Sequence, residues 1–154
     1  MEASEAVEQF NHYLKQRRHK LTRQRSVITE VFFDPERRAE HPTVEELFVR
    51  VRARESNVGY ATIYRTLKLL VDAGLAIPNR IGDDQTRYEP DVPGEHHDHM
   101  VCERCGLIVE FEDPEIERLQ EQIAERLGFR LRDHNMNLIG GPLDPCVRPD
   151  CRAN

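Results

Sequence analysis

The sequence predicts an α+β fold in two modules, and three observations support this prediction. Apolar residues recur at helical spacing through most of residues 7–74. Two short strand-like runs follow at 75–77 and 86–88, on either side of a turn-rich link. The formal charge changes sign along the chain, because residues 1–82 carry 14 basic and 11 acidic side chains and residues 83–154 carry 8 and 17. A basic module followed by an acidic one indicates two parts with different partners.

Three helices are predicted at the start of the basic module. The first has Phe10 and Leu14 on one apolar face, and the second opens near Thr22. The third begins at Thr43, whose Thr-x-x-Glu pattern with Glu46 is typical of a capping box. These signals predict that the first half of the chain is a helical domain.

A fourth helix is predicted within segment 59–74, and its polar face carries Tyr60, Tyr64, Arg65 and Lys68. This face suits the major groove of DNA, where Arg binds guanine through two hydrogen bonds and apolar groups contact thymine methyls. An ordinary amphipathic helix with solvated cations is the alternative. Helices followed by a hairpin favour a winged helix, in which the last helix enters the groove and the hairpin touches the backbone.

A basic stretch lies between residues 15 and 25, where six side chains are basic and none is acidic. Such a stretch is typical of a surface that faces phosphates. A solvated helix face is the alternative for a charge run taken alone.

Several classes of protein are disfavoured by composition. No apolar run approaches the roughly 18 residues that a membrane span needs. The first eight residues carry three Glu and no basic residue, which argues against a secretory or organellar leader and predicts a cytoplasmic protein. A zinc hydrolase would need an open metal site with a general base, but the sequence has no His-Glu-x-x-His motif, so no enzyme is expected.

The four cysteines divide into two chelating pairs, Cys102-x-x-Cys105 and Cys146-x4-Cys151. In a cytoplasmic protein such pairs bind metals more often than they form structural disulfides. Tetrahedral zinc with four sulfur ligands is the favoured interpretation. A transient disulfide switch and an iron–sulfur cluster are the alternatives.

Histidines cluster in the run His96-His-Asp-His99. If residues 96–101 form a strand, alternation sends His97 and His99 to one face and His96 and Asp98 to the other. The two faces can then serve two metal ions. A surface tract of histidines without a metal is the alternative.

The rest of the acidic module is predicted to hold a strand at 107–111, a helix with Asp113 as N-cap and Pro114 in its first turn, and one or two strands within 129–139. The helix is expected to bury an apolar stripe made of Ile116, Leu119, Ile123 and Leu127. Further potential metal ligands follow in these elements, namely Glu110, Glu117 and His134.

With these motifs in place, the chain resembles the ferric uptake regulator (Fur) family from about Lys20 to Cys151. The motifs are segment 59–67, the run from His96 to Cys105, the spacing of Glu110 and His134, and the closing Cys-x4-Cys. The resemblance implies a homodimer with an N-terminal winged helix-turn-helix domain and a small C-terminal α/β dimerisation domain. Together with the Pro/Gly break at 91–94, it implies a DNA-binding domain over 1–90, a hinge over 91–94 and a metal-binding dimerisation domain over 95–154.

The resemblance also implies three metal sites and a DNA contact surface. The family's structural Zn(II) ligands are matched by Cys102, Cys105, Cys146 and Cys151. Its regulatory metal ligands are matched by His41, Glu89, His97, His99 and Glu110. Its third metal site is matched by His96, Asp98, Glu117 and His134. Lys20 matches a minor-groove contact, and the groove-reading face comprises Tyr60, Thr62, Tyr64 and Arg65.

The function implied is Fe(II)-dependent repression of iron-uptake genes at an AT-rich palindromic operator, by the homodimer or a higher oligomer. A ligand set of nitrogen and oxygen atoms without thiolate suits Fe(II) or Mn(II), although Zn(II) also binds such sites. Sensors of manganese, zinc, nickel or peroxide from the same family are the alternatives. Glu110 favours the iron regulator, because peroxide sensors often have Asp at that position. If His41 and Glu89 share an ion with His97, the metal fixes the angle between the two modules.

Overall fold

The structure is a computed structural model that describes residues 1–80, 85–92, 97–141 and 143. The chain divides into two compact units, Met1–Glu95 and His96–Asn154. No helix in the described ranges is long and apolar enough to cross a membrane.

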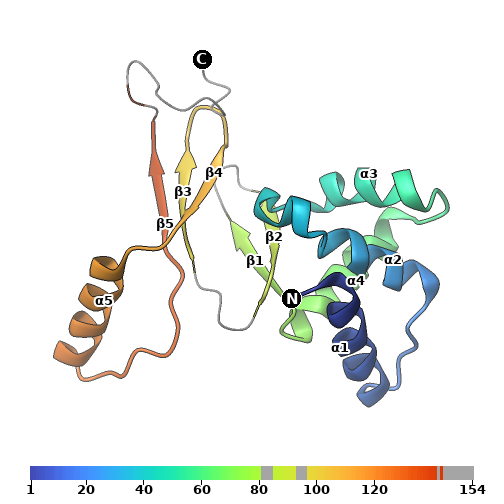
Figure 1. The fold of residues 1–154 in the computed structure, drawn as a ribbon, viewed down its shortest axis with the longest axis horizontal. Helices are drawn as coiled ribbons and strands as arrows, with labels where there is room; N and C mark the ends of the chain where they lie inside the picture. Colours follow the sequence, from blue (N-terminus) through green and yellow to red (C-terminus); the bar gives the residue numbers. More distant parts are fainter. Residues whose placement is uncertain (81–84, 93–96, 142, 144–154) are drawn as a thin grey trace. The chain divides into compact units, whose positions relative to one another are not determined.

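The first unit is a winged helix (Figure 1). Its helices are α1 (Ala3–Gln16), α2 (Arg23–Phe32), the 3-10 helix η1 (Pro35–Glu40), α3 (Val44–Arg54) and α4 (Tyr60–Asp72). A two-stranded antiparallel wing follows, made of β1 (Ala76–Arg80) and β2 (Thr86–Pro90). This architecture confirms the predicted order of helices followed by a hairpin. The turn residues 81–84 lie outside the described part of the chain.

The helix ends of the first unit follow from local chemistry. The Thr22 side chain caps α2 by accepting a hydrogen bond from the Arg25 backbone N–H at 3.3 Å. Thr43 and Glu46 form the predicted capping box at the start of α3. Gly74 has a φ of 67°, a left-handed conformation that costs glycine little, and it ends α4 as predicted.

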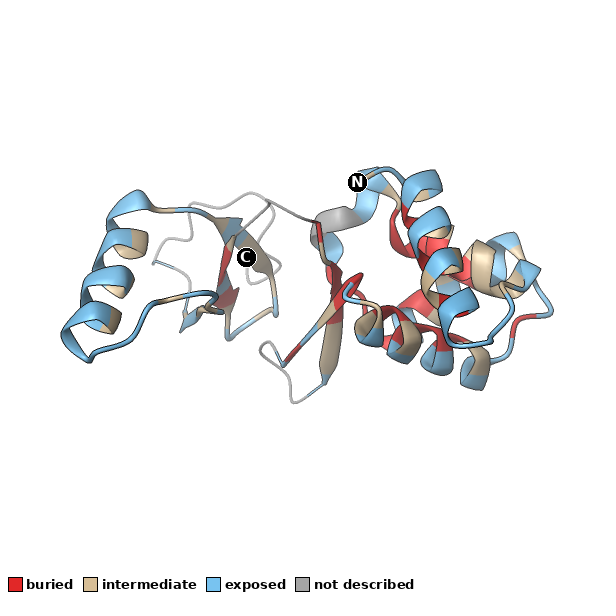
Figure 2. Ribbon diagram, turned by 90° about the horizontal axis from the view of Figure 1, so that it is seen from below, coloured by how far each residue is buried: buried red, intermediate tan, exposed pale blue. Residues whose placement is uncertain are grey.

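Each of the four α-helices of the first unit contributes at least one large apolar side chain to its core. Phe10, Ile28, Leu47 and Leu67 are each 0% exposed. Buried residues therefore concentrate between the helices of this unit, as Figure 2 shows. The first unit therefore has a hydrophobic core of its own.

The described part of the second unit contains a three-stranded sheet and one helix. The strands are β3 (Asp98–Cys102), β4 (Ile108–Phe111) and β5 (Asn137–Gly140), and the helix is α5 (Pro114–Arg126). The sheet order is β4-β3-β5, with β3 antiparallel to β4 and parallel to β5. Asp113 caps α5 through its side chain, as the sequence predicts.

Two expectations for the second unit are wrong. The stripe on α5 is not buried, because Leu119 is 50% exposed and Leu127 is 65% exposed, and the helix has no buried residue. The three strands that the structure describes in this unit are four or five residues long, and no residue of α5 is buried against them. Within 129–139 only the last residues join β5, so His134 lies in an irregular segment rather than on a strand.

Candidate metal centres and nucleic-acid interface

His41 and Glu89 form a buried pair in the first unit. The Nε2 atom of His41 lies 2.8 Å from Oε2 of Glu89, and both side chains are almost fully buried. The second carboxylate oxygen of Glu89 accepts a hydrogen bond from the Asn79 amide at 3.0 Å. The pair offers one imidazole and one carboxylate as metal ligands, and the Asn79 amide orients the carboxylate. Such ligands suit a divalent metal site that other residues complete.

The backbone of His41 is held in an unusual conformation. Its φ is 41° and its ψ is 66°, a left-handed geometry that costs a non-glycine residue about 1–2 kcal/mol. Arg87 donates to the His41 carbonyl at 3.2 Å and to the Glu46 carboxylate at 3.2 Å. The Tyr88 backbone N–H donates to the Pro42 carbonyl at 3.0 Å. The wing strand β2 therefore fixes His41 against the capped end of α3.

Asn79 and Arg87 were not predicted as parts of a site. Their roles depend on the hairpin register, which pairs Ile77 with Glu89 and Asn79 with Arg87. This register sets Asn79 diagonal to Glu89 on one face of the wing. The one signal in the sequence is the alternation of Arg87 and Glu89 with Tyr88 along β2, and β1 shows no such alternation.

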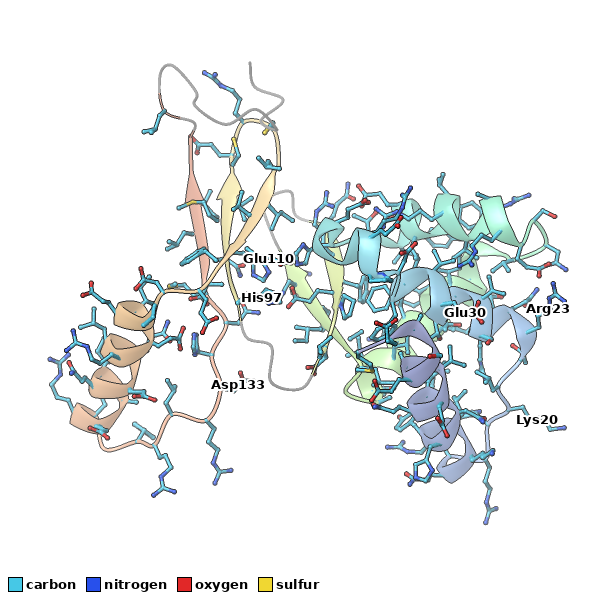
Figure 3. All side chains as sticks on the ribbon, in the orientation of Figure 1. Lys20, Arg23, Glu30, His97, Glu110 and Asp133 are labelled. Atoms are coloured by element: carbon cyan, nitrogen blue, oxygen red, sulfur yellow. The ribbon has the colours of Figure 1, made fainter. Side chains whose placement is uncertain are left out.

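In the second unit, His97, His99 and Glu110 gather on one face of the sheet. His97 Nε2 lies 3.7 Å from Oε1 of Glu110, and Figure 3 shows the two labelled side chains next to each other. The His97 and His99 rings meet edge to face with centroids 5.3 Å apart. His99 is also the register partner of Glu110 across β3 and β4. This set offers imidazole and carboxylate ligands but no thiolate, as Fe(II), Mn(II) and Zn(II) sites do.

The opposite face of β3 carries a second cluster, made of Asp98, Glu117 and His134. The Nε2 atom of His134 lies 3.6 Å from Oδ1 of Asp98 and 3.4 Å from Oε1 of Glu117. One ligand atom from each residue lies within 4.8 Å of the others, and Asp98 is 0% exposed. Two carboxylates this close repel each other in a dry site unless a cation lies between them. These three donors therefore fit a divalent metal. His96, the fourth residue predicted for this site, lies outside the described residues.

Asparagine at position 98 is expected to lower the metal content of the chain by one ion. The Asp98→Asn variant keeps the shape of the side chain but removes one charged ligand. At a metal concentration about 100 times the Kd, loss of that ion removes about 2.7 kcal/mol of metal-dependent stability. Metal analysis and thermal unfolding with and without Mn(II) measure both effects.

The same variant in metal-free protein is expected to be no less stable than the parent, because the repulsion between Asp98 and Glu117 is relieved. Asp133→Asn is the matched control, since Asp133 is an exposed neighbour of His134 (Figure 3). A metal-free Asp98→Asn protein that unfolds at a much lower temperature would show that Asp98 serves packing rather than metal binding.

Cys102 and Cys105 lie on a tight turn between β3 and β4. The Gly106 N–H donates to the Cys102 carbonyl at 2.8 Å, and the Cys102 N–H donates to the Leu107 carbonyl at 2.9 Å. Gly106 has a φ of 71°, so this turn requires glycine. Such a knuckle is typical of zinc ribbons. Cys146 and Cys151 lie outside the described residues.

The exposed face of α4 carries the residues that were predicted to read DNA. Tyr60, Tyr64 and Arg65 are exposed and Thr62 is half-buried. The Arg65 guanidinium donates to the Ala61 carbonyl at 3.1 Å, one turn earlier in α4. The helix therefore combines aromatic, hydroxyl and guanidinium groups on one side and the apolar core on the other.

Lys20 lies on the connection between α1 and α2. The Arg25 side chain donates to the Lys20 carbonyl at 2.8 Å, which fixes the backbone of this connection. The Lys20 side chain points away from the helices (Figure 3). An exposed cation on a fixed loop is suited to a contact with the DNA backbone or the minor groove.

Comparisons with known proteins agree on one family. The family model described as the ferric uptake regulator family matches residues 16–139. The chain is 45% identical over 124 residues to the ferric uptake regulation protein of Rhizobium leguminosarum bv. viciae, which covers 80% of this chain and 84% of that protein.

Solved structures extend this likeness to the fold. The ferric uptake regulator of Helicobacter pylori, described with three functional metal binding sites, aligns with a TM-score of 0.83 at 26% identity over 98% of this chain and 97% of that one. A zinc-bound manganese uptake regulator aligns with a TM-score of 0.67 at 42% identity over 87% of this chain and 98% of that one.

Proposed function

Because the chain belongs to the ferric uptake regulator family, we propose that it is an Fe(II)-dependent repressor of iron-uptake genes. Members of this family are metal-responsive regulators of transcription, and this chain is one of them. A regulator of this kind acts in the cytoplasm, where its DNA lies.

One observation supports metal control above all others. Each unit carries its own set of nitrogen and oxygen ligands, His41 with Glu89 in the first and His97 with His99 and Glu110 in the second. Neither set alone offers the five or six ligands that Fe(II) or Mn(II) takes in a site of this chemistry. We therefore propose that both sets would hold a single ion, which would link the units.

In this mechanism His41 and Glu89 of the first unit and His97, His99 and Glu110 of the second would hold one ion, which would set the angle between the DNA-binding domain (1–90) and the dimerisation domain (95–154) about the proposed hinge at 91–94. His41 contributes little reorganisation cost, because Arg87 already holds its backbone. The two α4 helices of a dimer then reach successive major grooves only when the metal is bound.

Tyr64 and Arg65 read bases in the proposed complex, together with Tyr60 and Thr62. Lys20 contacts the adjacent minor groove, where an AT-rich sequence is narrow and strongly negative. A structural Zn(II) would be held by Cys102 and Cys105 together with Cys146 and Cys151, as the family resemblance implies. The paired half-sites of a palindromic operator match the two-fold symmetry of a homodimer.

Dimerisation is proposed through the exposed apolar stripe of α5. Leu119, Ile123 and Leu127 lie on adjacent turns, and each is at least 45% exposed. A stripe of this kind on a helix with no buried residue indicates a protein interface. A second copy of the chain presents the same stripe, so a two-fold contact is self-complementary.

Glutamate at position 123 is expected to split the dimer. The Ile123→Glu variant introduces a charge at the centre of the stripe, where its desolvation in the interface costs several kcal/mol. Sedimentation analysis should then show a monomer at concentrations where the parent is a dimer. Gln122→Glu adds the same charge on a neighbouring face of α5 and is expected to leave the dimer intact. A dimeric Ile123→Glu protein would remove α5 from the interface.

A second candidate is manganese-dependent control, which the 42% identity to a manganese uptake regulator favours. Both metals accept the same nitrogen and oxygen ligands, so the ligand set alone does not separate them.

The test is DNA binding under anaerobic conditions. Random duplexes are selected with the protein in Fe(II), in Mn(II) and in chelator, and the affinity of the enriched operator is then measured in each. Metal-dependent retention of an AT-rich palindrome supports the proposal, and the metal that acts at the lower free concentration relative to its cellular level identifies the signal. Equal affinity with chelator would exclude metal-gated repression.

A further inference from the structure

Tyr60 is the first residue of α4, and its side chain contacts two residues of α3. The Tyr60 hydroxyl donates to Oε1 of Glu45 at 2.6 Å. Its ring meets the ring of Phe48 edge to face, with centroids 5.8 Å apart. Glu45 and Phe48 are one turn apart on α3, so the tyrosine is fixed at both its ring and its hydroxyl.

The hydrogen bond between Tyr60 and Glu45 keeps its proton on the tyrosine. It lowers the pKa of the Glu45 carboxyl and raises the pKa of the Tyr60 hydroxyl above the usual 10.0. Glu45 is therefore an ionised acceptor and Tyr60 a neutral donor, which is the charge-assisted and stronger form of such a bond. A tyrosine hydroxyl has one proton and keeps acceptor capacity on its oxygen.

We propose that Glu45 is a specificity-determining residue: it accepts the one hydrogen bond that the Tyr60 hydroxyl can donate, so that this hydroxyl can only accept hydrogen bonds from DNA. In the major groove, the groups that donate are the exocyclic amino groups of adenine and cytosine. Guanine O6 and N7 and thymine O4 are acceptors and offer no proton to this oxygen. Tyr60 then selects an amino-bearing base at one position of the half-site.

The same arrangement disfavours a phosphate contact at Tyr60. Phosphate oxygens only accept hydrogen bonds, and the neighbouring Glu45 carboxylate repels them. Tyr60 is 43% exposed at the N-terminal end of α4, where a recognition helix contacts base edges. The position and the hydrogen bonding therefore both favour base reading over backbone binding.

This role of Glu45 depends on the proposed function, because it requires that the exposed face of α4 meets DNA. The experiment uses the full-length metal-loaded dimer and the duplex enriched by the parent protein. Each adenine of the half-site is replaced in turn by purine, which lacks the 6-amino group, and each cytosine by a base that lacks the 4-amino group. Affinities are measured by competition for the parent, Tyr60→Phe, Glu45→Ala and Glu45→Gln.

The parent is expected to lose about fivefold in affinity when one particular amino group is removed, the magnitude of a single neutral hydrogen bond. Tyr60→Phe should show no loss at that position, because it has no hydroxyl to accept the bond. Glu45→Ala should also lose the preference, because the Tyr60 hydroxyl could then donate a hydrogen bond to acceptor groups on the bases. Glu45→Gln should retain most of it, because the amide oxygen accepts the same hydrogen bond.

Glu8→Gln removes an equal charge from the exposed surface of α1 and is expected to keep the parent's preference. A purely structural role for Glu45 would lower affinity for every duplex equally and is thereby distinguished. The role is overturned if Glu45→Ala keeps the parent's preference, or if Tyr60→Phe does. A parent protein that enriches no duplex in the presence of metal contradicts the proposed function itself.

Discussion

Cys102→Ser is expected to release the structural zinc and unfold the second unit, while the first unit remains folded. In the described residues of the second unit, Val101 is the only apolar side chain that is buried. A core this small does not stabilise a domain without a metal or a partner. Structural zinc provides about 10–16 kcal/mol of apparent binding free energy in small zinc domains at neutral pH. Loss of this binding free energy is as large as the whole free energy of unfolding of a typical domain, which is about 5–15 kcal/mol.

Native mass spectrometry and limited proteolysis measure this result. The zinc content of Cys102→Ser should fall to near zero, and protease should remove the second unit but leave a fragment that contains α1 to α4. Glu103→Gln, which lies between the two cysteines, is the matched control and is expected to retain zinc. A zinc-free Cys102→Ser dimer with the parent's melting temperature would contradict a structural role for the metal.

His41→Ala is expected to lower metal-dependent operator affinity by about 100-fold or more. Changes to residues that only support metal ligands already cost about 10- to 100-fold in affinity or activity, and loss of a ligand is at least as severe. In the proposed mechanism, loss of the imidazole would leave Glu89 as the first unit's only ligand among the named residues, and the angle between the units would no longer be set. The binding-competent arrangement then becomes a minor population, and apparent affinity falls by that fraction.

Operator titrations in Mn(II) and in chelator measure this loss. His41→Asn separates the ligand from the backbone, because asparagine tolerates the left-handed conformation but lacks the imidazole. Both His41 variants should lose metal dependence, whereas His12→Ala, an exposed histidine of α1, should keep it. Unchanged metal dependence in His41→Asn would remove His41 from the regulatory site.

Local patterns in the sequence correctly predicted the first unit. The capping box at Thr43, the left-handed glycine at the end of α4 and the hairpin strands are all decided by neighbouring residues. Alternation along β3 likewise predicted that His97 and Asp98 join different clusters, as they do. These features depend on interactions within a few residues of each other, so one sequence is enough to find them.

Features that depend on distant parts of the chain were not predicted. The link from Arg87 to the carbonyl of His41 requires the wing to pack against the start of α3, and no local pattern specifies that packing. The hydrogen bond between Glu45 and Tyr60 joins two helices whose crossing is set by the whole core. The stripe on α5 was predicted as core because an apolar helix face has the same residue spacing whether it packs within its own chain or against another protein.

If the chain pairs through α5 as proposed, this exposed stripe connects operator occupancy to the abundance of the protein. A lone subunit presents several large apolar side chains to solvent, among them Leu127 and Phe129. Such a subunit is prone to capture by chaperones and to proteolysis, whereas the proposed dimer would cover these side chains. Since the paired form grows with the square of the free subunit concentration, a small change in synthesis produces a larger change in the number of operators that are occupied.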